Sequence, residues 1–301
     1  MRLAITGGTG FVGSHLIDVA LSAGHDVSAL TRREQPARDG VDWIAGDLGS
    51  REALERLVDD ADAVIHVAGT INAPSAAGFE KGNVKGTLAM LAAATAGGVH
   101  RFVHVSSLAA REPKLSLYGA SKAKAEELVH SSGLDWAIVR PPAVYGPGDK
   151  ETLELFRMAK LGLMLMPPKG RVSVIHADDL SRLFIALASP SAPSNKLFEP
   201  DDGKPGGWTH REFARALAAA VGTRAAVISS PGILLRMAAR ADQFFRGEKA
   251  KLTVDRAAYF SHRNWVIEPK RAVPAKLWRP EIETLAGLSS TAAWYREQGW
   301  L

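Results

Sequence analysis

The chain has 301 residues, of which 46% are hydrophobic and 23% are charged, so it can bury a large core and is not expected to be disordered. Its formal net charge of +5 arises from 37 basic and 32 acidic residues without a block of like charge, which favours a small anionic ligand over nucleic acid. The absence of cysteine excludes disulfides, thiolate metal sites and a cysteine nucleophile.

The first residues form a strand-like run, Leu3-Ala4-Ile5, without a preceding basic and apolar targeting segment. No apolar stretch reaches the roughly 18–20 residues that a membrane-spanning helix needs. We therefore expect a cytoplasmic protein with no membrane span.

Short apolar runs typical of β-strands alternate with longer Ala- and Leu-rich stretches of helical periodicity. This alternation indicates parallel strands joined by crossover helices, because parallel neighbours need a long connection. We expect an α/β protein with a doubly wound parallel-sheet Rossmann fold, whose ligands bind at the carboxyl ends of the strands. The predicted strands are Arg2–Thr6, Asp26–Leu30, Ala63–His66, Arg101–Val105 and Trp136–Val139.

After Arg140, Pro and Gly residues break the chain into shorter pieces. We predict a strand over Val172–Ile175, a helix over Asp179–Ala188 and an irregular connection from Ser189 to Gly207. The NAD(P)-binding Rossmann domain is expected to span residues 1–190, with a substrate-lobe excursion near 150–170. A smaller C-terminal substrate-binding lobe is expected over residues 191–301.

A glycine-rich turn follows the first predicted strand and opens the first helix. Backbone N–H groups and the helix dipole converge there, which suits a pyrophosphate. A side chain at Gly7 or Gly10 would obstruct the turn or the phosphate, while Gly13 would let the helix pack closely on the strand. The turn residues expected to bind the cofactor are Gly7, Thr9, Gly10, Phe11 and Val12.

The second strand is followed by Arg32 and Arg33, where an NAD site would usually offer an acidic residue to the ribose. Arginine can clamp a 2′-phosphate, so we expect NADP(H) to be preferred, with NAD(H) as the alternative. The competing interpretation is two solvated surface arginines. Asp47 and Leu48 are placed to meet the adenine, although Asp47 suits the N-cap of the next helix equally well.

Tyr118 and Lys122 are four positions apart, which places them on one face of a helix. A free tyrosine has a pKa near 10, so it is a sluggish acid or base unless a nearby ammonium stabilises its phenolate. Ser107, after the strand Arg101–Val105, is placed to hydrogen-bond a reacting carbonyl oxygen. Ser106 is a weaker candidate for that role.

Three further features are better explained by structure than by ligand binding. His66, His104 and His176 flank strand ends without metal-site spacing, so we expect partly buried histidines with satisfied hydrogen bonds and no metal. Core packing is favoured for Leu161–Met166, with an apolar substrate pocket or a lipid contact as alternatives. Lys249–Arg256 has the mixed charges of a solvated helix face.

Motifs along the whole chain resemble the short-chain dehydrogenase/reductase superfamily, in its extended or atypical branch of NAD-dependent epimerase/dehydratase-like proteins. The similar segments include Thr6 to Gly13, Asp47-Leu48, His66-Val67-Ala68-Gly69, Asn83 to Thr87, Val105-Ser106-Ser107, Tyr118 to Lys122, Arg140 to Asp149, His176 to Leu180 and Thr291 to Trp300.

The resemblance implies that Tyr118 is the catalytic acid/base, that Lys122 lowers its pKa and holds the nicotinamide ribose, and that Ser107 orients the substrate. Asn83 would support the site, although an N-terminal capping role is about equally expected. Further cofactor contacts are implied at Val67, Ala68, Gly69, Pro141 and Val144.

The chain departs from the extended branch at one place. Only 11 positions separate Ser107 from Tyr118, where extended members carry a longer substrate-contacting insertion. This spacing argues against a sugar-nucleotide substrate.

We therefore predict an NADP(H)-dependent oxidoreductase that transfers hydride between the nicotinamide and a carbonyl or alcohol. Its only predicted partner is a small-molecule substrate, and we expect a monomer or homodimer. The alternatives are an NAD(P)-dependent epimerase or dehydratase of a sugar nucleotide, and a structural or regulatory protein that holds NADP(H) without turnover.

Overall fold

The computed structural model describes residues 1–247 and 253–301, which form two compact units. The first unit comprises Met1–Pro141, Ala177–Pro200 and Arg271–Arg279, and the second comprises Pro142–His176, Asp201–Lys270 and Pro280–Leu301. Each unit is described by itself. The domain limits 1–190 and 191–301 stay a prediction.

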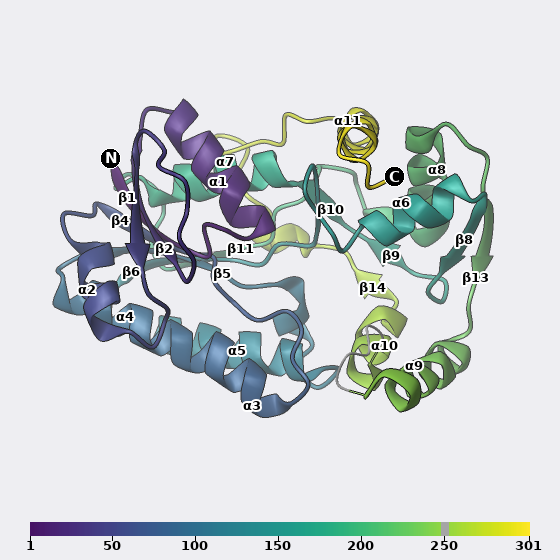
Figure 1. Cartoon of the computed structure of the whole chain (residues 1–301), viewed down its shortest axis with the longest axis horizontal. Helices are drawn as coiled ribbons and strands as arrows, with labels where there is room; N and C mark the ends of the chain where they lie inside the picture. Colours follow the sequence, from purple (N-terminus) through teal and green to yellow (C-terminus); the bar gives the residue numbers. More distant parts are fainter. Residues whose placement is uncertain (248–252) are drawn as a thin grey trace. The chain divides into compact units, whose positions relative to one another are not determined.

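The first unit is built on a seven-stranded sheet in the order β11-β6-β5-β4-β1-β2-β3, in which every neighbouring pair is parallel (Figure 1). The order reverses beside β1, which is the topology of a doubly wound Rossmann sheet and confirms the predicted fold class. The strands are β1 (Arg2–Thr6), β2 (Asp26–Thr31), β3 (Val41–Ala45), β4 (Ala63–His66), β5 (Arg101–Val105), β6 (Asp135–Val139) and β11 (Lys196–Phe198).

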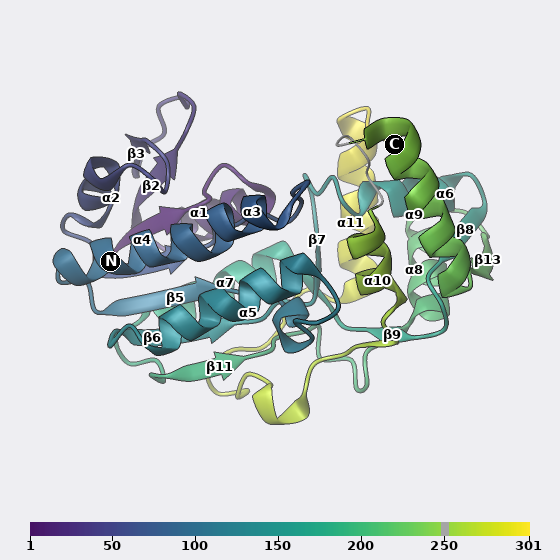
Figure 2. The same cartoon turned by 90° about the horizontal axis from the view of Figure 1, so that it is seen from below.

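Helices cover both faces of this sheet. α1 and α7 pack together on one face, while α2, α4 and α5 form a row on the other (Figures 1 and 2). The helical elements are α1 (Phe11–Ser22), α2 (Arg51–Val58), α3 (Ala76–Phe79), the π-helical turn η1 (Glu80–Lys85), α4 (Gly86–Ala96), the 3-10 turn η2 (Leu108–Arg111), α5 (Leu117–His130) and α7 (Ala177–Ala188).

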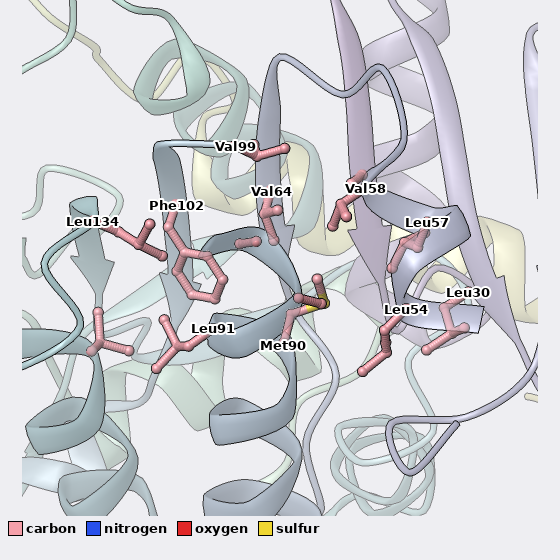
Figure 3. Packing of buried hydrophobic residues seen from close by; sticks show 14 of the residues in the cluster. Leu30, Leu54, Leu57, Val58, Val64, Met90, Leu91, Val99, Phe102 and Leu134 are labelled. Carbon is pink, nitrogen blue, oxygen red and sulfur yellow. The ribbon is translucent and has the colours of Figure 1, made fainter. Parts of the chain in front are cut away.

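Buried aliphatic side chains hold the second helix row against the sheet. Leu54 and Leu57 from α2 and Met90 from α4 belong to one buried cluster with Val64 and Phe102 of the central strands (Figure 3). Each of these side chains is at most 2% exposed, and burying one side chain of this size contributes about 1.5–3 kcal/mol. This packing fixes the strands whose carboxyl ends carry the candidate site.

The predicted irregular connection from Ser189 to Gly207 is corrected by the structure, because it contains the edge strand β11. β11 has only three residues, too few to show an alternating pattern, and it forms by pairing with β6. Its register, Phe198 opposite Val139, is therefore set by tertiary contact.

In its described residues, the second unit has three small sheets around a separate core. Its elements are β7 (Ala143–Tyr145), α6 (Leu153–Lys160), β8 (Leu163–Met166), β9 (Arg171–Val172), β10 (Val174–His176), β12 (Trp208–Thr209), α8 (His210–Val221), β13 (Ala226–Ser229), α9 (Gly232–Arg246), α10 (Val254–Ser261), β14 (Asn264–Trp265) and α11 (Thr284–Glu297). The 3-10 turn η4 (Pro269–Arg271) lies where the chain returns to the first unit. In the core, the Tyr295 ring packs edge-on against Phe156 and stacks on Trp300.

The single strand predicted over Val172–Ile175 is wrong, because the chain changes partners at Ser173. The Ser173 N–H donates to the carbonyl of Trp265 in β14, which is a partner strand of β9. The Ser173 carbonyl accepts from the N–H of Ala143 in β7, which is the partner strand of β10. β9 therefore belongs to the β12-β9-β14 sheet and β10 to the β10-β7 pair.

Two other predictions fall in this unit. Met164 and Met166 of β8 are buried in the core, as expected, but Leu161, Leu163 and Leu165 are exposed, so core packing accounts for only part of Leu161–Met166. In Lys249–Arg256, residues 249–252 lie outside the described residues, and α10 begins at Val254.

Candidate active site

The glycine turn leaves β1 with Gly7 in the left-handed region, at a φ of 77°. A Cβ on Gly7 would lie 2.7 Å from the backbone nitrogen of Ala68, which follows β4. Gly10 is the N-cap of α1 and makes no side-chain capping hydrogen bond. The backbone N–H groups in the first turn of the helix can therefore donate to a ligand. These features fit a bound pyrophosphate.

Gly13 has a different role from the one predicted. A Cβ there would overlap the carbonyl group of Gly7, so a side chain would displace the turn itself rather than the contact between helix and strand. Gly8 is also restricted, because a Cβ would lie 2.9 Å from the Cδ1 of Ile17.

Gly7 and Gly24 offer a matched test of this turn, because their φ angles are 77° and 75°. We expect Gly24→Ala to cost only the strain of a left-handed alanine, about 1–2 kcal/mol, since its Cβ would meet nothing within 4 Å. Gly7→Ala adds overlap with Ala68, worth about 1–3 kcal/mol more, and should abolish dinucleotide binding. Urea unfolding and cofactor titration measure both effects, and equal losses in the two variants would contradict the close approach.

Arg32 and Arg33 are exposed directly after β2. Neither side chain forms an ion pair with a residue that the structure describes. Asp47 is exposed, and its carboxylate accepts from the N–H of Gly49 at 2.8 Å. The N-cap of α2 is Ser50, so the capping interpretation of Asp47 is wrong. The Cδ1 of Leu48 would lie 2.6 Å from a Cβ on Gly86, which shows that Leu48 packs closely on α4.

Asn83 lies inside η1, so its predicted N-capping role is also wrong. Its side chain accepts from the N–H of Thr70 at 2.6 Å and donates to the Thr70 carbonyl at 3.0 Å and to the Ser121 hydroxyl at 2.8 Å. Asn83 thus joins the loop after β4 to α5. A Cβ on Gly69 would lie 3.0 Å from the Asn83 Oδ1 and 3.7 Å from the Lys122 Nζ, so these three predicted residues lie together.

The serine, tyrosine and lysine predicted from the sequence meet in the first unit. Ser107 follows β5, and its side chain lies near enough to the Tyr118 phenol to act on the pKa of that phenol. Tyr118 is half-buried in the first turn of α5, where Ser116 caps the helix by accepting from the N–H of Gly119 at 3.0 Å. Lys122 follows one turn later and is 5% exposed. The Tyr118 phenol and the Ser107 hydroxyl can therefore both donate hydrogen bonds to one substrate oxygen.

Burial is the main influence on both titrating groups of this set. It raises the pKa of Tyr118, and the hydrogen bond from Ser107 only partly opposes it. It lowers the pKa of Lys122 to about 8, against the attraction of Glu126. The Lys122 Nζ donates to the Val105 carbonyl at 2.7 Å, and the expectation that Lys122 lowers the pKa of Tyr118 stays a prediction.

A buried ion-pair network behind these residues was missed in the sequence. Arg140 donates to both oxygens of Glu126, at 2.8 and 2.6 Å, and its Nη1 lies 3.4 Å from Glu199. Ser106 donates to Glu126, so its buried hydroxyl is committed and Ser106 no longer competes with Ser107. The available signal was the position of Glu126, four residues after Lys122 on the same helix.

The histidine predictions are corrected in part. His66 is fully buried rather than partly so, with its ring nitrogens 2.7 Å from the Thr6 Oγ1 and 3.2 Å from the Thr87 Oγ1. His104 stacks on His66, and neither of its ring nitrogens has a hydrogen-bond partner among the described residues. His176 is buried edge-on to Tyr145 in the second unit.

The remaining predicted site residues lie in both units. The carbonyl of Pro141 accepts from the N–H of Leu108 at 3.0 Å, which ties the end of β6 to the segment after Ser107. Val144 lies in β7 of the second unit, opposite Ile175. Within residues 1–247 and 253–301, no three His, Asp or Glu side chains gather as metal ligands would.

Parallel strands with a glycine turn after the first and a Tyr–Lys pair on the helix after the fifth define a dinucleotide-binding oxidoreductase of the short-chain dehydrogenase/reductase type. The model of the NAD dependent epimerase/dehydratase family matches residues 3–198, and the chain belongs to this family. The predicted resemblance is thereby confirmed.

The relatives of the chain include reductases. A ceramide reductase of Caulobacter vibrioides is 38% identical, with 99% of this chain and 96% of the relative covered. A 2-alkyl-3-oxoalkanoate reductase of Stenotrophomonas maltophilia is 30% identical, with 74% and 76% covered. Together with the family match, these relatives confirm an NAD(P)-dependent oxidoreductase.

The fold agrees with solved structures. The enzyme WbmG of Bordetella bronchiseptica, solved in complex with NAD, has a TM-score of 0.77 at 20% identity, covering 100% of this chain and 95% of that one. In the part of our chain that the structure describes, no helix combines the length and apolar character needed to cross a bilayer.

Proposed function

We propose that this enzyme is an NADP(H)-dependent reductase of ketones that are attached to a long hydrocarbon chain. The nearness of Ser107 to the Tyr118 phenol carries the proposal, because it pairs a phenolic acid with a second donor for one carbonyl oxygen. The names of the two reductase relatives support the substrate class, since one acts on ceramide and the other on a 2-alkyl-3-oxoalkanoate. The short spacing from Ser107 to Tyr118 argues against a sugar nucleotide.

The residues of the first unit fit a dinucleotide. The turn of Gly7, Gly10 and Gly13 would hold the pyrophosphate, and Arg32 with Arg33 would hold the 2′-phosphate. When bound, NADPH supplies the hydride that reduces the carbonyl carbon. Further contacts are proposed at Thr9, Phe11, Val12, Asp47, Leu48, Val67, Ala68, Gly69, Asn83, Pro141 and Val144. A cytoplasmic location and a monomer or homodimer belong to the same proposal.

Tyr118 and Ser107 carry the proton chemistry in this proposal. Because burial raises the pKa of Tyr118, its phenol is protonated at neutral pH and can donate its proton to the developing alkoxide. Ser107 donates a hydrogen bond to the same oxygen and so stabilises the charge that forms there. Lys122, with a pKa of about 8, is mostly charged at neutral pH and adds a positive potential beside the strand end.

Turnover tests this proposal with NADPH and a series of ketones that differ only in alkyl chain length. We expect one NADPH to be consumed for each alcohol formed, with kcat/KM rising with chain length. Conversion of a sugar nucleotide without net NADPH consumption would instead identify an epimerase or dehydratase. NADPH binding without any turnover would leave only a dinucleotide-binding protein.

Arg32→Ala tests the preference for NADP(H). Loss of a charge-assisted, bidentate contact to phosphate should raise the Kd for NADPH about tenfold or more, whereas the Kd for NADH should change less than about twofold. Arg38→Ala is the matched control, because Arg38 is an exposed arginine of the same region that pairs with Asp18. Fluorescence titration measures both constants, and an unchanged NADPH preference in Arg32→Ala would refute the phosphate contact.

A further inference from the structure

The second unit carries an exposed apolar ribbon made by β8 and β13. The two strands are parallel, with Leu165 opposite Ile228 and Met164 opposite Val227. The methionine side packs into the core, while Leu165 and Ile228 are 53% and 52% exposed, and Leu163 on the same face is 43% exposed. The ribbon therefore has one face in the core and one apolar face in solvent.

A second apolar surface lies on α9, the helix that follows β13 in the chain, and begins at Ile233. Ile233 and Met237 are one helical turn apart and are 60% and 59% exposed. The same helical stripe continues with Arg240 and Phe244, which are exposed and lie three and seven residues after Met237. An amphipathic helix in a water-soluble domain normally turns such a stripe to the core, so this outward stripe indicates a contact surface.

Basic residues predominate in the segments that form both surfaces. No Asp or Glu occurs from Leu155 to Ala177 or from Phe213 to Ala241, and the first acidic residue on α9, Asp242, pairs with Arg246. The same segments place exposed cations beside the apolar residues, at Lys160, Lys169, Arg224 and Arg240. The surface therefore complements an anionic partner, and it would repel a second copy of itself.

We propose that the β8–β13 ribbon and the α9 stripe form a surface that binds anionic phospholipid bilayers. Exposed aliphatic and aromatic side chains would enter the headgroup boundary, while the flanking cations would meet lipid phosphates. The purpose of this surface, access to ketones held in a membrane by a hydrocarbon chain, rests on the proposed function. The binding itself does not, because it requires neither cofactor nor substrate.

Co-sedimentation of the full chain with vesicles tests the proposal. Vesicles of phosphatidylcholine alone are compared with vesicles that also contain phosphatidylglycerol, without cofactor or ketone. We expect binding to the anionic vesicles, at least about fivefold weaker binding to the neutral ones, and release by salt. Two double variants, Leu165→Ser with Ile228→Ser and Ile233→Ser with Met237→Ser, should each lower the partition coefficient about tenfold or more.

The matched control is Leu88→Ser with Leu285→Ser, which removes exposed leucines outside both surfaces and should bind vesicles as wild type does. Circular dichroism and NADPH titration show that each variant folds. Equal binding by wild type and the surface variants, or no wild-type binding to anionic vesicles, would overturn the proposal. Concentration-dependent self-association that the same variants abolish would also overturn it, in favour of a second copy. Vesicle binding without ketone reduction would refute the proposed function alone.

Discussion

Tyr118→Phe is expected to lower kcat for ketone reduction by about 10²–10⁴-fold while leaving the Kd for NADPH nearly unchanged. The ring remains, so its contact with Phe79, at 6.2 Å between centroids, is preserved. Only the phenolic hydroxyl beside Ser107 is lost, and with it the proton for the reacting oxygen. Single-turnover measurements with saturating NADPH separate this chemical step from cofactor binding.

Tyr259→Phe is the matched control for that variant. Tyr259 lies in α10 of the second unit, and phenylalanine keeps both the ring, which stacks on Trp265 at 4.6 Å between centroids, and the backbone carbonyl that accepts from the Trp265 indole. This variant should keep a kcat within about twofold of wild type. Undiminished activity in Tyr118→Phe would remove the phenol from the mechanism, and a simultaneous loss of NADPH affinity would point to a disturbed fold.

The central strands could be predicted from the sequence, because their residues are buried on both faces of the sheet. Ala63–His66 and Arg101–Val105 form the observed strands with the predicted bounds, since continuous apolar runs with punctuated ends are visible locally. β11 and the change of partner at Ser173 were not visible. Both depend on pairing with strands distant in the sequence, which no local pattern encodes.

The candidate site shows the same division between local and distant information. Tyr118 and Lys122 could be placed together because helical geometry fixes residues four apart. The direction of the Tyr118 pKa could not be predicted, because it depends on how deeply the fold buries the ring and on where the Lys122 ammonium is directed. The contact of Arg140 with Glu126 and Glu199 likewise joins three separate segments.

Acid destabilisation is the second large effect that we expect, and it arises from His66 and His104. Burial, aided by the Lys122 ammonium, lowers the pKa of His66 to about 3 and that of His104 well below its usual value. The unfolded chain binds a proton at each histidine below a pKa of about 6.5, whereas the folded chain does not until the pH is much lower. The stability due to these neutral rings is therefore complete above pH 6.5 and is lost as the pH falls from there toward 3.

The expected loss between about pH 7.5 and about pH 5 is about 2 kcal/mol for each histidine. Urea unfolding at a series of pH values measures it, and His104→Leu should remove about half of this dependence. Because neither ring nitrogen of His104 has a hydrogen-bond partner among the described residues, the same variant should lose little stability at pH 7.5. His100→Gln, at an exposed position, should keep the wild-type dependence. If the unfolding free energy depended on pH equally in wild type and His104→Leu, the folded protein would protonate this ring as readily as the unfolded chain does. The assignment of His104 as a buried neutral imidazole would then be wrong.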